Sequence, residues 1–136
     1  MGQDVGHDIE HNGSSLMPDD DARAEAHAMW QEVMGFDPPP ITDPYTEFTT
    51  DAVFGRVWTR PGLPRRDRRI TSLTVIALRG LKEPLVAHMS AAIDSGDISV
   101  DELHEWVLHL AHYGGWPIAA NAYAVLREVQ AHPSRS

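Results

Sequence analysis

The clearest hydrophobic pattern lies in the C-terminal third of the chain. Apolar side chains recur there at spacings of three and four, as on one face of an amphipathic helix: Val100, Leu103, Trp106, Val107, Leu110 and Ala111. Ser99 and Glu102 have the spacing of a capping box, which predicts where this helix begins. Gly114 and Gly115 suit a helix end, and Pro117 suits the first turn of the next helix. The pattern therefore predicts a helical hairpin.

Four helical stretches are expected before this hairpin. Residues 20–34 combine helix formers with acidic side chains in the first turn, which complement the helix dipole. Residues 44–58 follow an extended connector that contains three consecutive prolines. Residues 70–81 are apolar nearly all round, so we expect a central helix buried on most sides. A fourth helix begins near Pro84, and no partner strand is visible for the β-branched residues, so the chain is predicted to be an all-α bundle of about six helices.

The N-terminal segment differs from the rest of the chain. Residues 1–19 are polar, contain glycine and have no apolar period, so they cannot bury enough surface to offset the entropy of ordering. We expect a disordered tail there. Residues 20–132 should then form a single domain, because a chain of 136 residues has room for one substantial core.

Composition narrows the class of partner. The chain has 20 acidic against 11 basic side chains, so its overall field repels phosphate backbones and we expect no nucleic-acid partner. It has no cysteine, which excludes disulfides, thiolate metal sites and thiol redox chemistry and fits a reducing compartment. No apolar run approaches the roughly 20 residues that span a bilayer. We therefore expect a cytoplasmic protein that does not enter the membrane.

Candidate chemistry lies on the polar side of the helices. Glu105, His109 and His112 fall on one face of their helix, and a carboxylate four residues before an imidazole can orient it and keep it protonated. An ordinary solvated helix face explains the same pattern. His88 lies at the edge of an apolar stripe, where an imidazole would be half buried and could serve either packing or function.

Positive charge is concentrated at one corner of the chain. Six of the eleven cations lie within fourteen residues there: Arg56, Arg60, Arg65, Arg66, Arg68 and Arg69. Guanidinium groups bind carboxylates with two parallel hydrogen bonds. The corner is therefore either a solvated turn paired with neighbouring carboxylates or a site for a small anion.

Four segments together resemble the carboxymuconolactone decarboxylase family, closest to its γ-carboxymuconolactone decarboxylase type. They are FGRVWTRPGLPRRDR, ITSLTVIALRGL, HMSAAIDSG and VDELHEWVLHLAHYGGWPIAANAY, and the resemblance spans about residues 23–130. It implies an AhpD-like helical bundle that forms a homotrimer or homohexamer and uses no organic cofactor or metal. The alkylhydroperoxidase branch of the family carries two cysteines, whose positions fall here on Leu81 and Pro84, so thiol chemistry is not expected.

The resemblance also implies the site residues. The expected catalytic residues are His88, Glu105 and His109, and the expected substrate-binding residues are Arg60, Arg68, Tyr113 and Trp116. In this hypothesis the arginines anchor a carboxylate, the two histidines supply a hydrogen-bond donor and an acid, and the glutamate orients its histidine.

The implied reaction is the removal of CO2 from an unsaturated carboxylated lactone through a stabilised enolate. Trp116 is bulkier than its counterpart in the γ-type enzymes, and Asn121 lies one position later than the usual asparagine, so a different small carboxylated substrate in a specialised pathway is a second interpretation. A metal-dependent relative with His88, His109 and His112 as ligands is a third. A non-catalytic oligomeric binding protein is a fourth.

Overall fold

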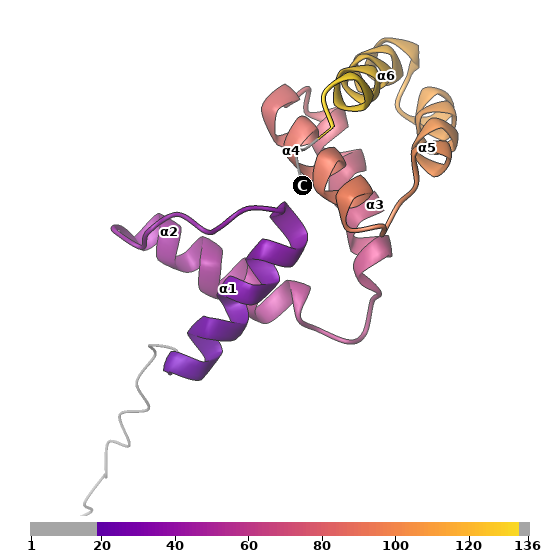
Figure 1. Cartoon of the computed structure of the whole chain (residues 1–136). Coiled ribbons are helices and arrows are strands. Elements are labelled where there is room, and N and C mark those ends of the chain that lie inside the picture. The colour runs from indigo at the N-terminus through magenta and orange to yellow at the C-terminus, as the bar shows by residue number, and fades with distance from the viewer. Residues whose placement is uncertain (1–18, 134–136) are drawn as a thin grey trace, which may run out of the picture.

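The computed structural model describes residues 19–133, and every regular element within them is helical (Figure 1). The elements are α1 (Asp20–Met34), α2 (Pro44–Phe48), η1 (Thr49–Trp58), α3 (Arg65–Leu78), α4 (Lys82–Asp94), α5 (Val100–Tyr113) and α6 (Trp116–Ala131). The all-α prediction is therefore confirmed for this part of the chain. The expected disordered tail lies outside the described residues except for Asp19, whose carboxylate accepts a hydrogen bond from the Ala22 N–H and caps α1. In the described region no helix is long and apolar enough to cross a membrane.

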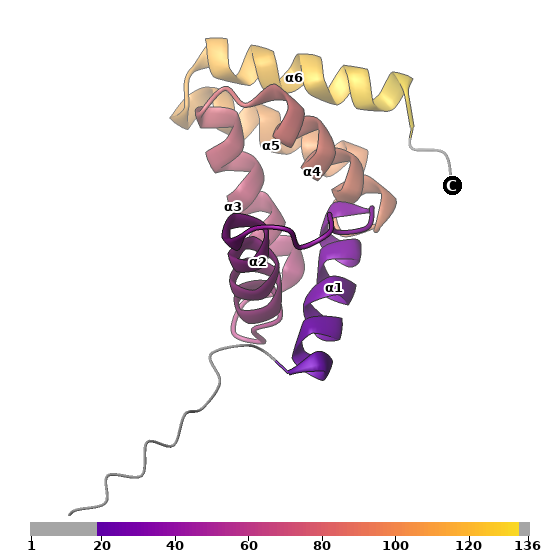
Figure 2. The same ribbon diagram turned by 90° about the vertical axis from the view of Figure 1, so that its left-hand side faces the viewer.

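The helices form two packed groups, which lie apart in Figure 1, whereas in the turned view of Figure 2 α2 lies in front of α3. In the first group α1 lies alongside η1, and the aromatic rings of Trp30, Phe54 and Trp58 are buried between them. In the second group α3, α4, α5 and α6 surround a larger core. Its bulkiest fully buried side chains are Leu73, Met89, Ile98, Leu103 and Leu126.

A buried arginine connects the two groups. Arg69 of α3 is 1% exposed, and its guanidinium donates to the carbonyl oxygens of Glu32 and Val33, both at 2.8 Å, in the last turn of α1. Its Nε donates to Asp97 Oδ2 at 2.6 Å, and Arg65 adds a second ion pair to the same carboxylate at 2.7 Å. Burial alone would raise the pKa of Asp97, but the hydrogen bonds from the two arginines outweigh it and lower that pKa to about 2.

The predicted hairpin is present, with its capping box. Ser99 Oγ accepts from the Glu102 N–H at 3.1 Å, and Glu102 Oε2 accepts from the Ser99 N–H at 2.9 Å. Both glycines at the corner are required, for different reasons. A Cβ on Gly114 would lie 3.0 Å from methyl groups of Leu110 and of Leu78, whereas Gly115 has a φ of +99°, which side chains other than glycine rarely adopt.

The helix predicted over residues 44–58 is α-helical only as far as Phe48. From Thr49 to Trp58 it continues as η1, a π-helix. Within η1, Gly55 lies so close to α1 that an added Cβ would lie 3.0 Å from the Cβ of Ala26. Hydrophobic periodicity cannot distinguish these two helix types over so short a segment, because their turns differ by less than one residue.

The prediction that residues 70–81 are buried on most sides is wrong for the single chain. The helix α3 begins earlier, at Arg65, and its fully buried residues are Arg69, Leu73 and Ala77. Val75 and Leu78 are 51% and 47% exposed. The reason is that α4 and α6 cover α3 from one side, so the apolar residues on its other side face outward.

Candidate active site

Three of the polar side chains singled out in the sequence meet on the outer face of α5. Glu105, His109 and His112 line one surface hollow of about 460 Å³, which we call the α5 shelf. Ile70 of α3 and Trp106 of α5 supply apolar lining to the same hollow. The three polar residues share a face because they are spaced by four and three along a helix whose start the capping box fixes.

The two imidazoles of the shelf are held by aromatic and backbone contacts. The ring of His109 stacks on Tyr113, with centroids 4.8 Å apart and 22° between the planes. His112 Nδ1 lies 2.9 Å from the Leu108 carbonyl oxygen, and the ring lies 5.8 Å from that of Trp116. Because a carbonyl can only accept, Nδ1 of His112 is the protonated nitrogen, and Nε2 is left for a substrate.

The framework of the shelf is fixed by contacts between α3 and α5. Trp106 Nε1 donates to Thr74 Oγ1 at 3.0 Å, and Arg66 pairs with Glu102 at 2.8 Å. Glu105 itself makes no ion pair with the described part of the chain, His109 included. The carboxylate and the imidazole therefore share the hollow without direct contact, and both are exposed to solvent.

His88 occupies a different place from the shelf. It is half-buried on α4, as predicted, and its Nδ1 is buried without a hydrogen-bond partner in the described residues. Burial lowers the pKa of His88, and the nearby charge of Arg69 lowers it further, so the ring is neutral at neutral pH. Since His88 does not line the α5 shelf, one chain does not bring the two predicted catalytic histidines together.

The arginine corner is mostly a paired turn. Arg65, Arg66 and Arg69 form ion pairs with carboxylates, which confirms the structural interpretation for these three. Arg68 donates to the carbonyl oxygens of Leu63 and Arg60, both at 3.1 Å, and so holds the corner itself. The guanidinium of Arg60 is exposed and makes no ion pair in the described region.

The two aromatic residues predicted to bind substrate are highly exposed. Tyr113 is 84% and Trp116 64% exposed. Trp116 also lines a second, mainly apolar groove of about 350 Å³ between α5 and α6, with Leu108 at its border with the shelf. The sequence analysis did not find this groove, and its signal was the run of alanines in α6 that includes Ala119 and Ala120.

The interpretation as a metal-dependent enzyme needs a cluster of ligating side chains, and the described residues do not form one. Residues 19–133 contain no group of three or more histidine, cysteine, aspartate or glutamate side chains that could hold a metal ion. In particular, His88 lies apart from His109 and His112.

The sequence model of the carboxymuconolactone decarboxylase family matches residues 43–128, which is more than half of the chain. The chain belongs to this family. The match includes every candidate site residue from Arg60 to Trp116, whereas α1 lies outside it. The family resemblance inferred from the motifs is thus confirmed.

Two curated proteins are similar to the chain over part of its length. The 4-carboxymuconolactone decarboxylase of Acinetobacter baylyi is 34% identical over 85 residues, which cover 62% of this chain and 63% of that protein. The nitrosuccinic acid decarboxylase npaB of Metarhizium robertsii is 36% identical over 89 residues, which cover 65% of this chain and 62% of that protein. The chain spans less than two thirds of the length of either relative.

Proposed function

We propose that the protein is a decarboxylase of a small organic acid and that the reaction takes place on the α5 shelf without an organic cofactor or metal. The observation that carries this proposal is the meeting of Glu105, His109 and His112 in one hollow, within the segment that matches the family. The names of both relatives support loss of CO2 as the reaction class.

The two relatives suggest a common substrate chemistry. One is named for a carboxylated unsaturated lactone and the other for a dicarboxylic acid with a nitro group. In each compound the electron pair left by CO2 can move onto oxygen, through the double bond to the lactone carbonyl or into the nitro group. The proposed substrate is therefore a small acid whose leaving carboxylate is activated by such a group, and a γ-carboxymuconolactone-like lactone is the first candidate.

The residues of the shelf take the following roles. His109 acts as the general acid and donates the proton that replaces CO2 on carbon, and Glu105 lies one turn before it on the same shelf. His112 lines the same hollow, and its Nε2 is the ring nitrogen that the Leu108 carbonyl does not occupy. Arg60 does not line the shelf of its own chain, so it can anchor a second carboxylate of the substrate only at a shelf that another subunit provides. Arg68 positions Arg60 by holding the corner.

An open shelf is poorly suited to this reaction, because a leaving carboxylate is least stable where water is excluded. We therefore propose that the protein works as a homotrimer or homohexamer in which a neighbouring subunit covers the shelf. The exposed side chains of Leu108, Tyr113 and Trp116 around it support such a contact. His88 can then act only at a shelf that another subunit provides. The lack of cysteine supports the cytoplasm as the place of action.

The test is CO2 release from γ-carboxymuconolactone and from nitrosuccinate, with His109→Ala beside the unchanged protein. Loss of a general acid typically costs about 10² to 10⁴ in rate. His132→Ala is the matched control, because this exposed histidine at the end of α6 lies outside the shelf. Full turnover by a folded His109→Ala protein would contradict the assigned role, and saturable binding without turnover would favour a binding protein.

A further inference from the structure

A further hollow lies where α6 crosses the turn between α3 and α4, and none of the proposed catalytic or substrate-binding residues lines it. Its volume is about 310 Å³, at the lower end of the range of small-molecule pockets. We call it the α4–α6 cleft. It shares no lining residue with the α5 shelf, so an inference about it does not depend on the proposed reaction.

The floor of the cleft is apolar and belongs to the main core. Leu85, Ala122 and Val125 line it, and each is buried in the large core cluster as well. The hollow exists because small residues stand where two helices meet, with Ala77 on α3 and Ala122 on α6. A floor built from fixed core side chains is already formed before any ligand arrives.

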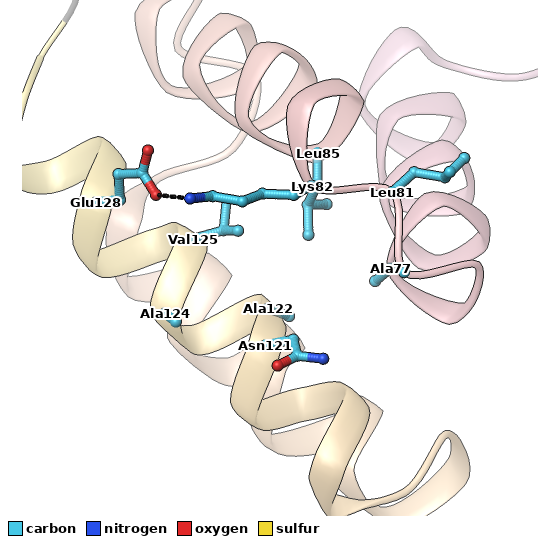
Figure 3. A pocket seen from close by; sticks show the side chains of 10 residues that line it. Ala77, Leu81, Lys82, Leu85, Asn121, Ala122, Ala124, Val125 and Glu128 are labelled. Atoms are coloured by element: carbon cyan, nitrogen blue, oxygen red, sulfur yellow. Dashed lines mark ion pairs between the residues drawn. The ribbon is translucent and has the colours of Figure 1, made fainter.

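The rim of the cleft carries few polar groups, and they face one another across the opening. Lys82 Nζ pairs with Glu128 Oε2 at 3.0 Å, and the lysine side chain extends across the cleft to α6 (Figure 3). Both side chains are largely exposed, at 61% and 45%, so the pair contributes little and opens easily. The carboxamide of Asn121 also lies on this rim and makes no hydrogen bond with the described part of the chain.

We propose that the α4–α6 cleft binds a small aromatic or alicyclic carboxylate, with the ring on the apolar floor and the carboxylate on Lys82. The ligand then replaces Glu128 as the partner of the ammonium group, and Glu128 turns into solvent. An anion is favoured over a cation because Lys82 lines the cleft whereas Glu83, the acidic residue of the same turn, does not. The helix α4 also has no side-chain cap, so the N–H groups of Lys82 and Glu83 add partial positive charge beside the ammonium. Asn121 is placed to bond a second polar group on the ring.

The experiment is an NMR titration of the ¹⁵N-labelled full chain with benzoate, with benzylamine and benzyl alcohol as probes of matched size. Benzoate should bind saturably with a roughly millimolar dissociation constant, as expected for so small a ligand. The shifted amides should be those of Leu81, Leu85, Ala122 and Val125. Tighter binding of benzylamine would overturn the carboxylate assignment, and shifts confined to the α5 shelf, or none that saturate, would overturn the site.

Substitutions can show whether benzoate affinity depends on the charge of Lys82 in the cleft or on the net charge of the whole molecule. Lys82→Met should weaken benzoate binding by about tenfold, which corresponds to about 1.4 kcal/mol. Arg79→Met removes another exposed cation, which does not line the cleft, and should leave binding unchanged. Glu128→Gln should strengthen binding, because it removes the competing carboxylate, and Ala124→Leu should block binding by filling the hollow from its exposed side. Equal weakening by Arg79→Met and Lys82→Met would overturn the proposal.

Discussion

Thr50 differs from the other threonines of the described helices. Thr49, Thr59, Thr71 and Thr74 each donate their hydroxyl to the carbonyl oxygen four residues earlier. Thr50 of η1 is fully buried, and its Oγ1 has no partner in the described residues. A buried hydroxyl without a hydrogen-bond partner lowers the stability of the fold. Thr50 therefore destabilises the protein, whereas the threonines with a bonded hydroxyl do not.

Replacing Thr50 by valine should therefore be neutral or raise the free energy of unfolding, by up to about 1 kcal/mol, since the shape is kept and the unpaired hydroxyl is removed. Thr74→Val is the matched control. It deletes the hydroxyl that accepts from Trp106 at 3.0 Å and should lower stability by about 1 kcal/mol. Urea unfolding of both variants measures the difference. A clear loss of stability in the Thr50 variant would mean that its hydroxyl is bonded after all, for example to an internal water.

Among these substitutions, a change at Asp97 should lower the free energy of unfolding the most. In Asp97→Asn the buried Arg69 keeps its charge but loses its carboxylate partner, which typically costs about 3 kcal/mol. Asp67→Asn is the control, because its 3.8 Å contact with Arg66 is exposed and should contribute little. Equal unfolding free energies for the two variants would show that Arg69 does not depend on this ion pair.

The same carboxylate also predicts a pH dependence. The pKa of Asp97 falls from an ordinary 3.8 to about 2 in the folded chain. Its contribution to stability is therefore complete above about pH 4 and is lost as the pH falls from 3.8 through about 2. The stability difference between the unchanged protein and Asp97→Asn should shrink over that interval, as measured by urea unfolding at a series of pH values. A difference that is constant across this range would place its origin elsewhere.

At the scale of the elements, the corner between α5 and α6 decides how the aromatic side chains border the shelf. Gly115 is the N-cap of α6 and has φ +99° and ψ 148°, a conformation that is essentially confined to glycine. It directly precedes Trp116, whose ring lies beside that of His112. Strain at Gly115 would therefore displace Trp116 and, through it, the ring of His112 on the shelf.

Gly115→Ala should destabilise the protein by about 1 to 3 kcal/mol, because alanine cannot adopt this backbone conformation without strain. Gly62→Ala is the matched control. Its φ is not in the left-handed range and no atom lies within 4 Å of an added Cβ, so it should be neutral or slightly stabilising. Thermal unfolding checks both, and a neutral Gly115 variant would show that the corner can relax into another conformation.

The hairpin was predictable because its signals are local. The capping box, the spacing of apolar residues in α5 and the glycine corner each depend on neighbours within four residues. The meeting of Glu105 and His109 followed from the same periodicity. The switch to a π-helix at Thr49, the role of Arg69 and the α4–α6 cleft could not be predicted, because each depends on which helices pack together. Arg69 and Arg68 look alike in the sequence, yet one is buried against Asp97 and the other holds a turn.

At the scale of the whole molecule, apolar surface is distributed in a way that one chain does not explain. Val75 and Leu78 of α3, Leu108 of α5 and Trp116 of α6 are all large and substantially exposed. We propose that these side chains lie at subunit contacts, because closed symmetric assemblies are the usual way to cover exposed apolar surface. The separation of His88 from His109 within one chain points to the same proposed assembly, in which a shelf is completed by a neighbour.

This arrangement predicts that two inactive variants restore each other. If the shelf takes His109 from one subunit and His88 from the next, His88→Ala and His109→Ala proteins should each be inactive, whereas oligomers formed from an equal mixture should regain about a quarter of the activity, since that share of sites receives both histidines. Glu105→Gln mixed with His109→Ala is the control. Both changes lie on the same shelf, so no mixed oligomer contains an intact site and no activity should return.

The readout is CO2 release after the two proteins are refolded together, with native mass spectrometry to establish that mixed oligomers form. Recovery in the first mixture and not in the second has no explanation within a single chain, because no subunit there carries an intact set of groups. If mixed oligomers form and stay inactive, or if His88→Ala alone keeps full activity, His88 does not act at the shelf. Its burial beside Arg69 is then a matter of packing, and the reaction belongs to the α5 residues alone.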